Sequence, residues 1–89
     1  MTPTEARDIA DRGFVHIAGE AELVSALLAQ SGSDVAGLKA MAGRPEFGQF
    51  ILDFLLENDR RVLDFAQAEG IAPQRVVMAR AVLGGGDPW

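Results

Sequence analysis

The sequence predicts an all-α protein, a compact bundle of five or six short helices around a central apolar helix at about residues 46–57. Residues 47–57 read Phe-Gly-Gln-Phe-Ile-Leu-Asp-Phe-Leu-Leu-Glu, and their polar side chains recur every four positions, at Gln49, Asp53 and Glu57. On a helix these three form one narrow stripe, and apolar side chains cover most of the remaining surface. No stretch of four or more residues alternates like a strand between turn signals. The sequence therefore predicts helices and no sheet.

A helix that is apolar on most sides has to be enclosed by its neighbours. Each large apolar side chain gains about 1.5–3 kcal/mol when it leaves water. Pro45 suits the first helical turn, where its missing N–H matters least, and Glu46 complements the positive end of the helix dipole. We therefore expect the other helices to surround this segment.

Three helices are expected before the central one. Apolar residues at helical spacing mark a first helix that ends at Gly19, a second that ends at Gly32, and a third that Gly43 closes. Side chains with an oxygen close to the backbone are good N-caps. On that basis Thr4, with Pro3 just outside the helix, is expected to cap the first helix and Ser33 the third.

Two helices are expected after it. Asn58 or Asp59 caps the fifth helix, which ends at Gly70, and Pro73 starts the sixth. The glycine run at 84–86 ends that helix. At this length there is room for one core, so residues 1–83 are expected to form a single domain and residues 84–89 a flexible tail.

The two halves of the chain show the same pattern. A shift of 38 positions aligns Phe14 with Leu52 and Leu27 with Phe65, and it aligns Gly32 with Gly70. Both halves then read helix, helix, glycine, helix. This alignment predicts a twofold repeat of a three-helix unit, while two unrelated helical patterns in register would produce the same alignment.

Composition narrows the classes of function. The 89 residues carry a net charge of −5, which disfavours non-specific attraction to nucleic acid or anionic membranes. The sequence contains no cysteine, which excludes disulfides and thiolate chemistry and fits a reducing compartment. The charged N-terminus does not read as a signal peptide, and no apolar run is long enough to span a membrane. We expect a cytoplasmic protein.

One motif resembles a helix-turn-helix. Ala66, Gly70 and Val76 have the spacing of a small residue at a helix contact, a glycine in the turn and an apolar anchor on the second helix. In that interpretation the helix at 73–83 would enter a DNA groove with its polar residues facing out. The alternative is plain packing, since any two helices joined by a tight turn need these positions. The nucleic-acid contacts would be Gln74, Arg75 and Arg80.

The sequence predicts no catalytic, cofactor-binding or metal-binding residues. His16 is the only histidine and lies at the border of the apolar arc of the first helix, with Glu20 one turn later. Such a pair could act as a base or sense pH, but a partly buried edge histidine is the commoner arrangement. The carboxylates lack metal-site spacing, and the glycine run at 84–86 lacks the lysine that a phosphate loop needs.

Exposed apolar residues are the better lead to function. Val15 is predicted to lie in the polar arc of the first helix, and Met78 and Val82 on a face of the last helix that points away from Val76 and Ala79. Apolar and aromatic side chains are favoured at protein interfaces. The predicted partner surface, which would bind an unknown protein or a second copy, consists of Val15, Met78, Val82 and Trp89.

The second half of the chain carries a family resemblance. Its motifs are Ile-Leu-Asp-Phe-Leu-Leu at 51–56, Leu63-x-Phe65-Ala66-x-x-x-Gly70, Pro73-x-x-Val76 and Ala-x-Leu-Gly-Gly-Gly-Asp at 81–87. With these the chain resembles the alphaproteobacterial family of short proteins catalogued as domain of unknown function 3572. The likeness is best over residues 45–87 and weaker upstream. It implies a bacterial, all-helical, standalone protein, and it implies no activity.

These observations favour a non-catalytic protein-interaction or regulatory module. The alternative is a helix-turn-helix DNA-binding protein that uses the helix at 73–83.

Overall fold

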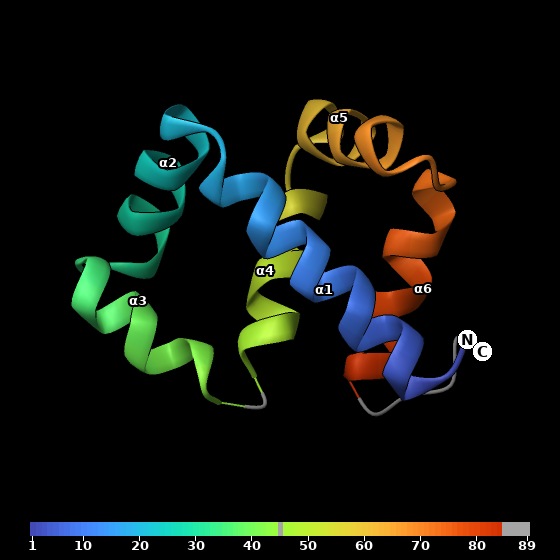
Figure 1. Ribbon diagram of the computed structural model, residues 1–89, viewed down its shortest axis with the longest axis horizontal. Coiled ribbons are helices and arrows are strands. Elements are labelled where there is room, and N and C mark those ends of the chain that lie inside the picture. Colours follow the sequence, from blue (N-terminus) through green and yellow to red (C-terminus); the bar gives the residue numbers. More distant parts are fainter. Residues whose placement is uncertain (45, 85–89) are drawn as a thin grey trace.

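The computed structural model describes residues 1–44 and 46–84, which form six α-helices and no strand (Figure 1). The predicted all-α class is therefore confirmed. Pro45 and the residues after Gly84, including Trp89, lie outside the described part. In chain order the helices are α1 (Pro3–Ala18), α2 (Ala21–Ser31), α3 (Val35–Ala42), α4 (Phe47–Leu56), α5 (Asp59–Glu69) and α6 (Pro73–Leu83).

The first helix starts earlier than the sequence suggested. The side chain of Thr2, not Thr4, is the N-cap of α1, and its Oγ1 accepts a hydrogen bond from the Glu5 N–H at 3.1 Å. Pro3 is therefore the first residue inside the helix, where its fixed φ and missing N–H are harmless. Both threonines have the right chemistry, and the placement of the proline at the first helical position favours Thr2.

Two further caps involve short polar side chains. Asp34, not Ser33, caps α3, because its Oδ1 accepts from the Gly37 N–H at 2.8 Å. Of the two alternatives for α5, Asn58 is the cap, with its Oδ1 accepting from Arg60 N–H at 2.9 Å. Carboxylate and amide oxygens satisfy N–H groups that the first turn leaves without helical partners.

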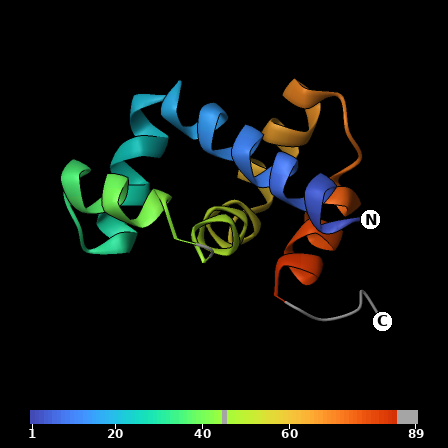
Figure 2. The same ribbon diagram turned by 60° about the horizontal axis from the view of Figure 1, so that its bottom comes forward.

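The fourth helix lies at the centre, as predicted. Ile51, Leu52, Phe54 and Leu55 of α4 are each 0% exposed. Figure 2 shows α4 almost end-on, with α1 crossing over it, α2 and α3 to one side and α5 and α6 to the other. The crossing with α1 is close at Gly13, where a Cβ would lie 3.1 Å from Leu55 Cδ1.

The polar stripe of α4 links this helix to two neighbours. Gln49 Nε2 donates a 2.7 Å hydrogen bond to the carbonyl of Leu83 at the end of α6, and Asp53 forms an ion pair with Arg80 of the same helix. At the far end of the stripe, Glu57 accepts a 2.9 Å hydrogen bond from Gln30 of α2. The stripe therefore bonds α4 to α6, which packs along it, and to α2 through one exposed hydrogen bond.

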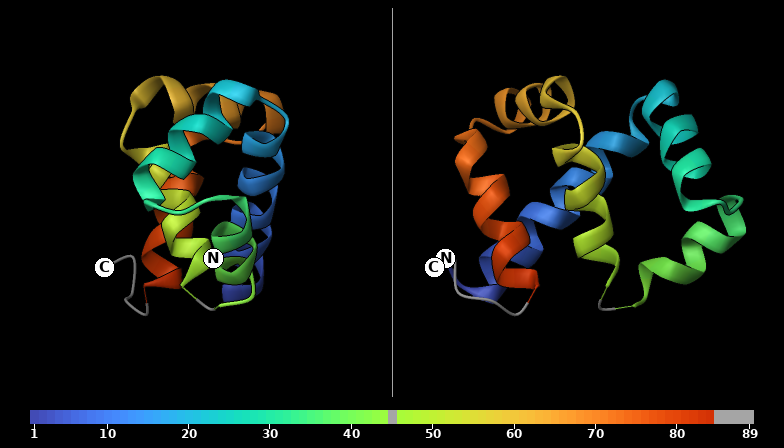
Figure 3. Two further views of the ribbon diagram at one scale, coloured as in Figure 1. Left: turned by 90° about the vertical axis from the view of Figure 1, so that its left-hand side faces the viewer. Right: turned by 180° about the vertical axis from the view of Figure 1, so that it is seen from behind.

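Several helix boundaries follow the predicted offset of 38 residues, although α4 begins at Phe47, six residues later than the shifted start of α1. α2 and α5 span residues 21–31 and 59–69, and α3 and α6 start at residues 35 and 73. Gly32 and Gly70 end the second helix of each half with φ of 68° and 67°. The packing differs, because α6 lies against both α1 and α4 whereas α3 makes few contacts with α2 and α4 (Figure 3). The repeat therefore holds for local structure and not for tertiary packing.

The left-handed glycines provide a test of this local structure. We expect Gly32→Ala and Gly70→Ala each to lower the free energy of unfolding by about 1 kcal/mol, because an L-residue is strained at positive φ. A Cβ has open space at both positions, so the backbone conformation alone sets this cost. Urea unfolding followed by circular dichroism measures it.

Gly43→Ala is the matched control. Gly43 also follows a helix and has open space around its Cα, but its φ is −84°. We expect no loss of stability there. Equal destabilisation by all three substitutions would contradict the assignment of left-handed conformation to Gly32 and Gly70.

Candidate functional site

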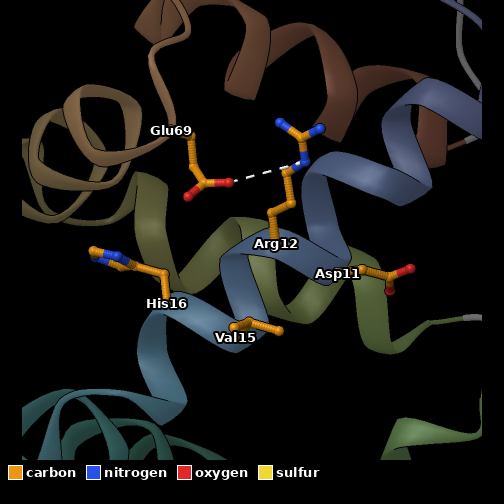
Figure 4. Close-up of a pocket in the computed structure, with 5 residues that line it drawn as sticks. All are labelled: Asp11, Arg12, Val15, His16 and Glu69. Atoms are coloured by element: carbon orange, nitrogen blue, oxygen red, sulfur yellow. Dashed lines mark ion pairs between the residues drawn. The ribbon is translucent and has the colours of Figure 1, made fainter.

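Two adjoining hollows lie on the face formed by the C-terminal half of α1, the start of α2, and α5. Their volumes are about 270 and 200 Å³, and His16 lines both. We call their lining residues together the His16 face. The first hollow is lined by Asp11, Arg12, Val15, His16 and Glu69, and the second by His16, Glu20, Glu22, Leu23, Asn58, Arg60, Arg61 and Asp64 (Figure 4 shows the first).

The side chains of α1 and α5 that meet here run in opposite order along the two helices. Arg12 lies near Glu69, with Nε and Oε1 3.9 Å apart. One turn further along α1, the His16 ring packs edge-on against the ring of Phe65, with 5.5 Å between ring centroids. Phe65 is 0% exposed, so its ring belongs to the core beneath His16.

His16 is half-buried, as expected for a histidine at the border of an apolar arc. Glu20, which the sequence placed one turn later, lines the second hollow together with His16, but no hydrogen bond joins their side chains in the described part of the chain. The ring of His16 therefore has the buried Phe65 ring as its aromatic neighbour.

Val15 is the most exposed large apolar side chain in the described residues, at 71%. The prediction that it lies on the polar side of α1 is therefore confirmed. Figure 4 shows Val15 between His16 and Asp11, while Arg12 is directed toward Glu69. The hollow thus combines an apolar side chain in open solvent with charged residues around it.

Two of the three arginines on this face contact carboxylates of the same chain. Arg12 Nε lies 3.1 Å from Asp8 Oδ2, in addition to its longer contact with Glu69. Arg60 pairs with Asp64 one turn along α5, with 3.5 Å between Nε and Oδ2. Exposed pairs of this kind contribute little to stability, but they do neutralise the arginines locally.

The third arginine, Arg61, lies over the ring of Phe54, with its Cζ 4.1 Å from the ring centroid, and donates to the Phe54 carbonyl at 3.2 Å. By contrast, the carboxylates of Asp11, Glu20 and Glu22 are exposed and have no hydrogen bond or ion pair within the described residues. These three carboxylates therefore form no ion pair within the described residues, although Asp11 also lines a third hollow together with Arg7 and Arg44.

The other predicted partner residues do not join Val15 in these hollows. Met78 is half-buried, and Trp89 lies outside the described residues. Val82 is partly buried against the core, so it is not the exposed apolar side chain that the sequence predicted. The reason is that α6 is covered by α1 and α4, and the exposed valine of this helix is Val77, at 49%. The sequence reasoning missed Val77 because it depends on the rotation of α6 between those neighbours.

The predicted nucleic-acid contacts are partly engaged within the chain. Gln74 is exposed, but Arg75 Nη2 lies 3.4 Å from Glu5 Oε2 and Arg80 pairs with Asp53. The motif residues Ala66 and Val76 are 2% and 0% exposed, because they pack the two helices together. These two positions therefore pack α5 against α6, which both a helix-turn-helix and plain helix packing require.

Among the described residues, no three His, Cys, Asp or Glu side chains gather as metal ligands. None of the helices in the described part of the chain combines the length and apolar character needed to cross a bilayer.

The fold and site define a six-helix all-α protein whose α1–α5 face carries an apolar hollow with a charged rim. The chain belongs to the family described as Protein of unknown function (DUF3572), whose family model matches residues 3–86. This confirms the family resemblance found in the sequence. Comparisons with curated proteins and with solved structures find no match.

The pairing of Arg80 gives a testable prediction. We expect Arg80→Ala to lower the free energy of unfolding by about 1 kcal/mol, because its charge-assisted hydrogen bond to Asp53 is only partly exposed to solvent. Arg75→Ala is the matched control on the same helix, since its pair with Glu5 is more exposed, and we expect a change within about 0.5 kcal/mol. Urea unfolding measures both, and an equal effect of the two substitutions would contradict a structural role for Arg80.

Proposed function

We propose that this protein is a non-catalytic protein-interaction module that binds a partner protein through its His16 face. The observation that carries the proposal is the 71% exposure of Val15 in the mouth of the first hollow. Burying a valine side chain gains about 1.5–3 kcal/mol, and a hollow around it allows a partner side chain to fit closely. Val15 is therefore the expected centre of the interface.

The contacts of His16 support a non-catalytic role. Its ring packs against the buried Phe65 ring, whereas a general base is usually oriented by a carboxylate or carbonyl that bonds one of its nitrogens. The arginines nearby are held by in-chain contacts at Asp8, Asp64 and the Phe54 ring. The face therefore has the character of a recognition surface.

We further propose that the protein acts in a bacterial cytoplasm. The sequence lacks cysteine, as is common for proteins in a reducing compartment. The partner is either another protein or a second copy of the chain.

The alternative function is DNA binding through α6. In its favour, Gln74 and Arg75 are exposed on this helix. Against it, Arg75 and Arg80 each face a carboxylate, which would have to be displaced or would repel the phosphate backbone. We therefore favour protein binding.

Val15→Ser tests the proposed interface. We expect it to abolish capture of the partner from a lysate of cells that express the protein, because the apolar centre of the interface is lost. Val35→Ser is the matched control, since Val35 is another exposed helical valine, at 53%, and does not line either hollow. Val35→Ser should leave capture intact. For both variants, the free energy of unfolding measured by thermal denaturation should stay within about 0.5 kcal/mol of that of the original chain. Loss of the same partner with both variants, or with neither, would count against the His16 face.

Fluorescence anisotropy with labelled duplex DNA tests the alternative. We expect no salt-sensitive binding at low ionic strength, where electrostatic attraction to DNA is strongest. Binding that falls with salt and weakens in Arg75→Ala and Arg80→Ala would favour the DNA-binding function instead.

A further inference from the structure

We infer that the partner segment recognised by the His16 face is a basic amphipathic helix, with an apolar side chain against Val15 and lysine or arginine side chains beside Asp11, Glu20 and Glu22. This inference rests on the proposed function and specifies the chemistry of the partner at the same site.

The shape of the face favours a helical segment. The first hollow lies along the C-terminal half of α1, the second lies where α1 gives way to α2, and His16 is common to both. α5 borders both hollows, with Glu69 at the first and Asp64 at the second. α1 and α5 cross at a steep angle (Figure 3), and the two hollows follow one another along the chain from Asp11 to Leu23, which suits an elongated segment such as an amphipathic helix that lays its apolar face over both.

The charge of the face favours a basic segment. The residues lining the two hollows include five carboxylates and three arginines, so their net charge is 3 − 5 = −2. The three arginines are engaged with Asp8, Asp64 and the Phe54 ring, whereas three of the carboxylates have no partner within the described residues. A segment with lysine or arginine on its polar flanks would neutralise these carboxylates, and an acidic segment would be repelled.

The same charge argues against a second copy as the occupant. Each chain carries a net charge of −5, so self-association through this face would bring carboxylates of two copies together. The face therefore suits a partner of opposite charge. Self-association through the same face is a competing outcome of the experiment.

The experiment uses the full chain and three fluorescent synthetic peptides. Each peptide is about 16 residues long, a length at which an alanine-rich sequence begins to form a helix in water. All three share one leucine-lined face, and the polar flanks carry lysine in the first peptide, glutamine in the second and glutamate in the third. Fluorescence anisotropy measures their affinities, and amide chemical shifts locate the bound peptide on the protein. We expect the lysine peptide to bind at Val15 and His16, and to bind at least about tenfold more tightly than the glutamate peptide.

Charge-matched variants separate recognition from general attraction. Asp11→Asn with Glu20→Gln removes two carboxylates from the face, and Asp34→Asn with Glu46→Gln removes two that line neither hollow. Both double variants change the net charge from −5 to −3. Asparagine at position 34 can still cap α3. We expect the first double variant to weaken binding of the lysine peptide about fivefold and the second to weaken it less than about twofold.

Each alternative outcome would contradict either the basic-helix inference or the proposed function. Equal weakening by the two double variants, chemical shifts away from the His16 face, or self-association that Val15→Ser abolishes would overturn the basic-helix inference. Equal binding of the lysine and glutamine peptides, with both weakened by Val15→Ser, would overturn the inference and leave the proposed function standing. Unchanged binding of every peptide to Val15→Ser would overturn the placement of the interface at Val15, and with it the proposed function at this site.

Discussion

The burial of α4 is the constraint on which the rest of the structure depends. Four of its side chains are 0% exposed, and the helix has too few polar positions to face solvent on more than one side. The side chains at those polar positions also contact neighbouring helices. Gln49 and Asp53 form a hydrogen bond and an ion pair with α6, and Glu57 accepts a hydrogen bond from α2. Hydrophobic burial thus requires neighbours on most sides of α4, and the polar stripe adds bonds to α6 and one exposed hydrogen bond to α2.

The candidate site is a consequence of how α1 meets the helices around α4. The N-terminal half of α1 lies against α6, where Glu5 contacts Arg75, and its C-terminal half crosses α4 at Gly13. Beyond that crossing α1 has few contacts with α5 and ends at Ala18, so the two helices leave hollows between them. His16 covers Phe65 at this point, and Val15, one residue earlier on the helix, is directed to solvent.

Features set by local chemistry could be predicted from the sequence, and features set by distant residues could not. The central helix, the left-handed Gly32 and Gly70 and the exposed Val15 follow from side-chain periodicity and backbone sterics. The N-caps were placed within two residues, because adjacent threonine, serine and aspartate side chains offer the same oxygen chemistry. The pairs Arg80–Asp53 and Arg75–Glu5 join residues 27 and 70 positions apart, and no local pattern in the sequence brings them together. The His16 face could not be predicted for the same reason, because its residues come from α1, the start of α2 and α5, and no local pattern joins them.

The pairing of the arginines connects the fold to the proposed recognition. A net charge of −5 would by itself give only diffuse attraction for cations, screened within about 10 Å at moderate salt. In this fold Arg12 and Arg60 are drawn to Asp8 and Asp64, while Asp11, Glu20 and Glu22 have no such partner. Of these, Asp11 lines the hollow in which Val15 is 71% exposed, and Glu20 and Glu22 line the adjoining one. An apolar centre with carboxylates on its rim selects for a segment that is itself both apolar and basic. A segment that is only apolar would leave the carboxylates without a partner, and a segment that is only basic would leave Val15 uncovered.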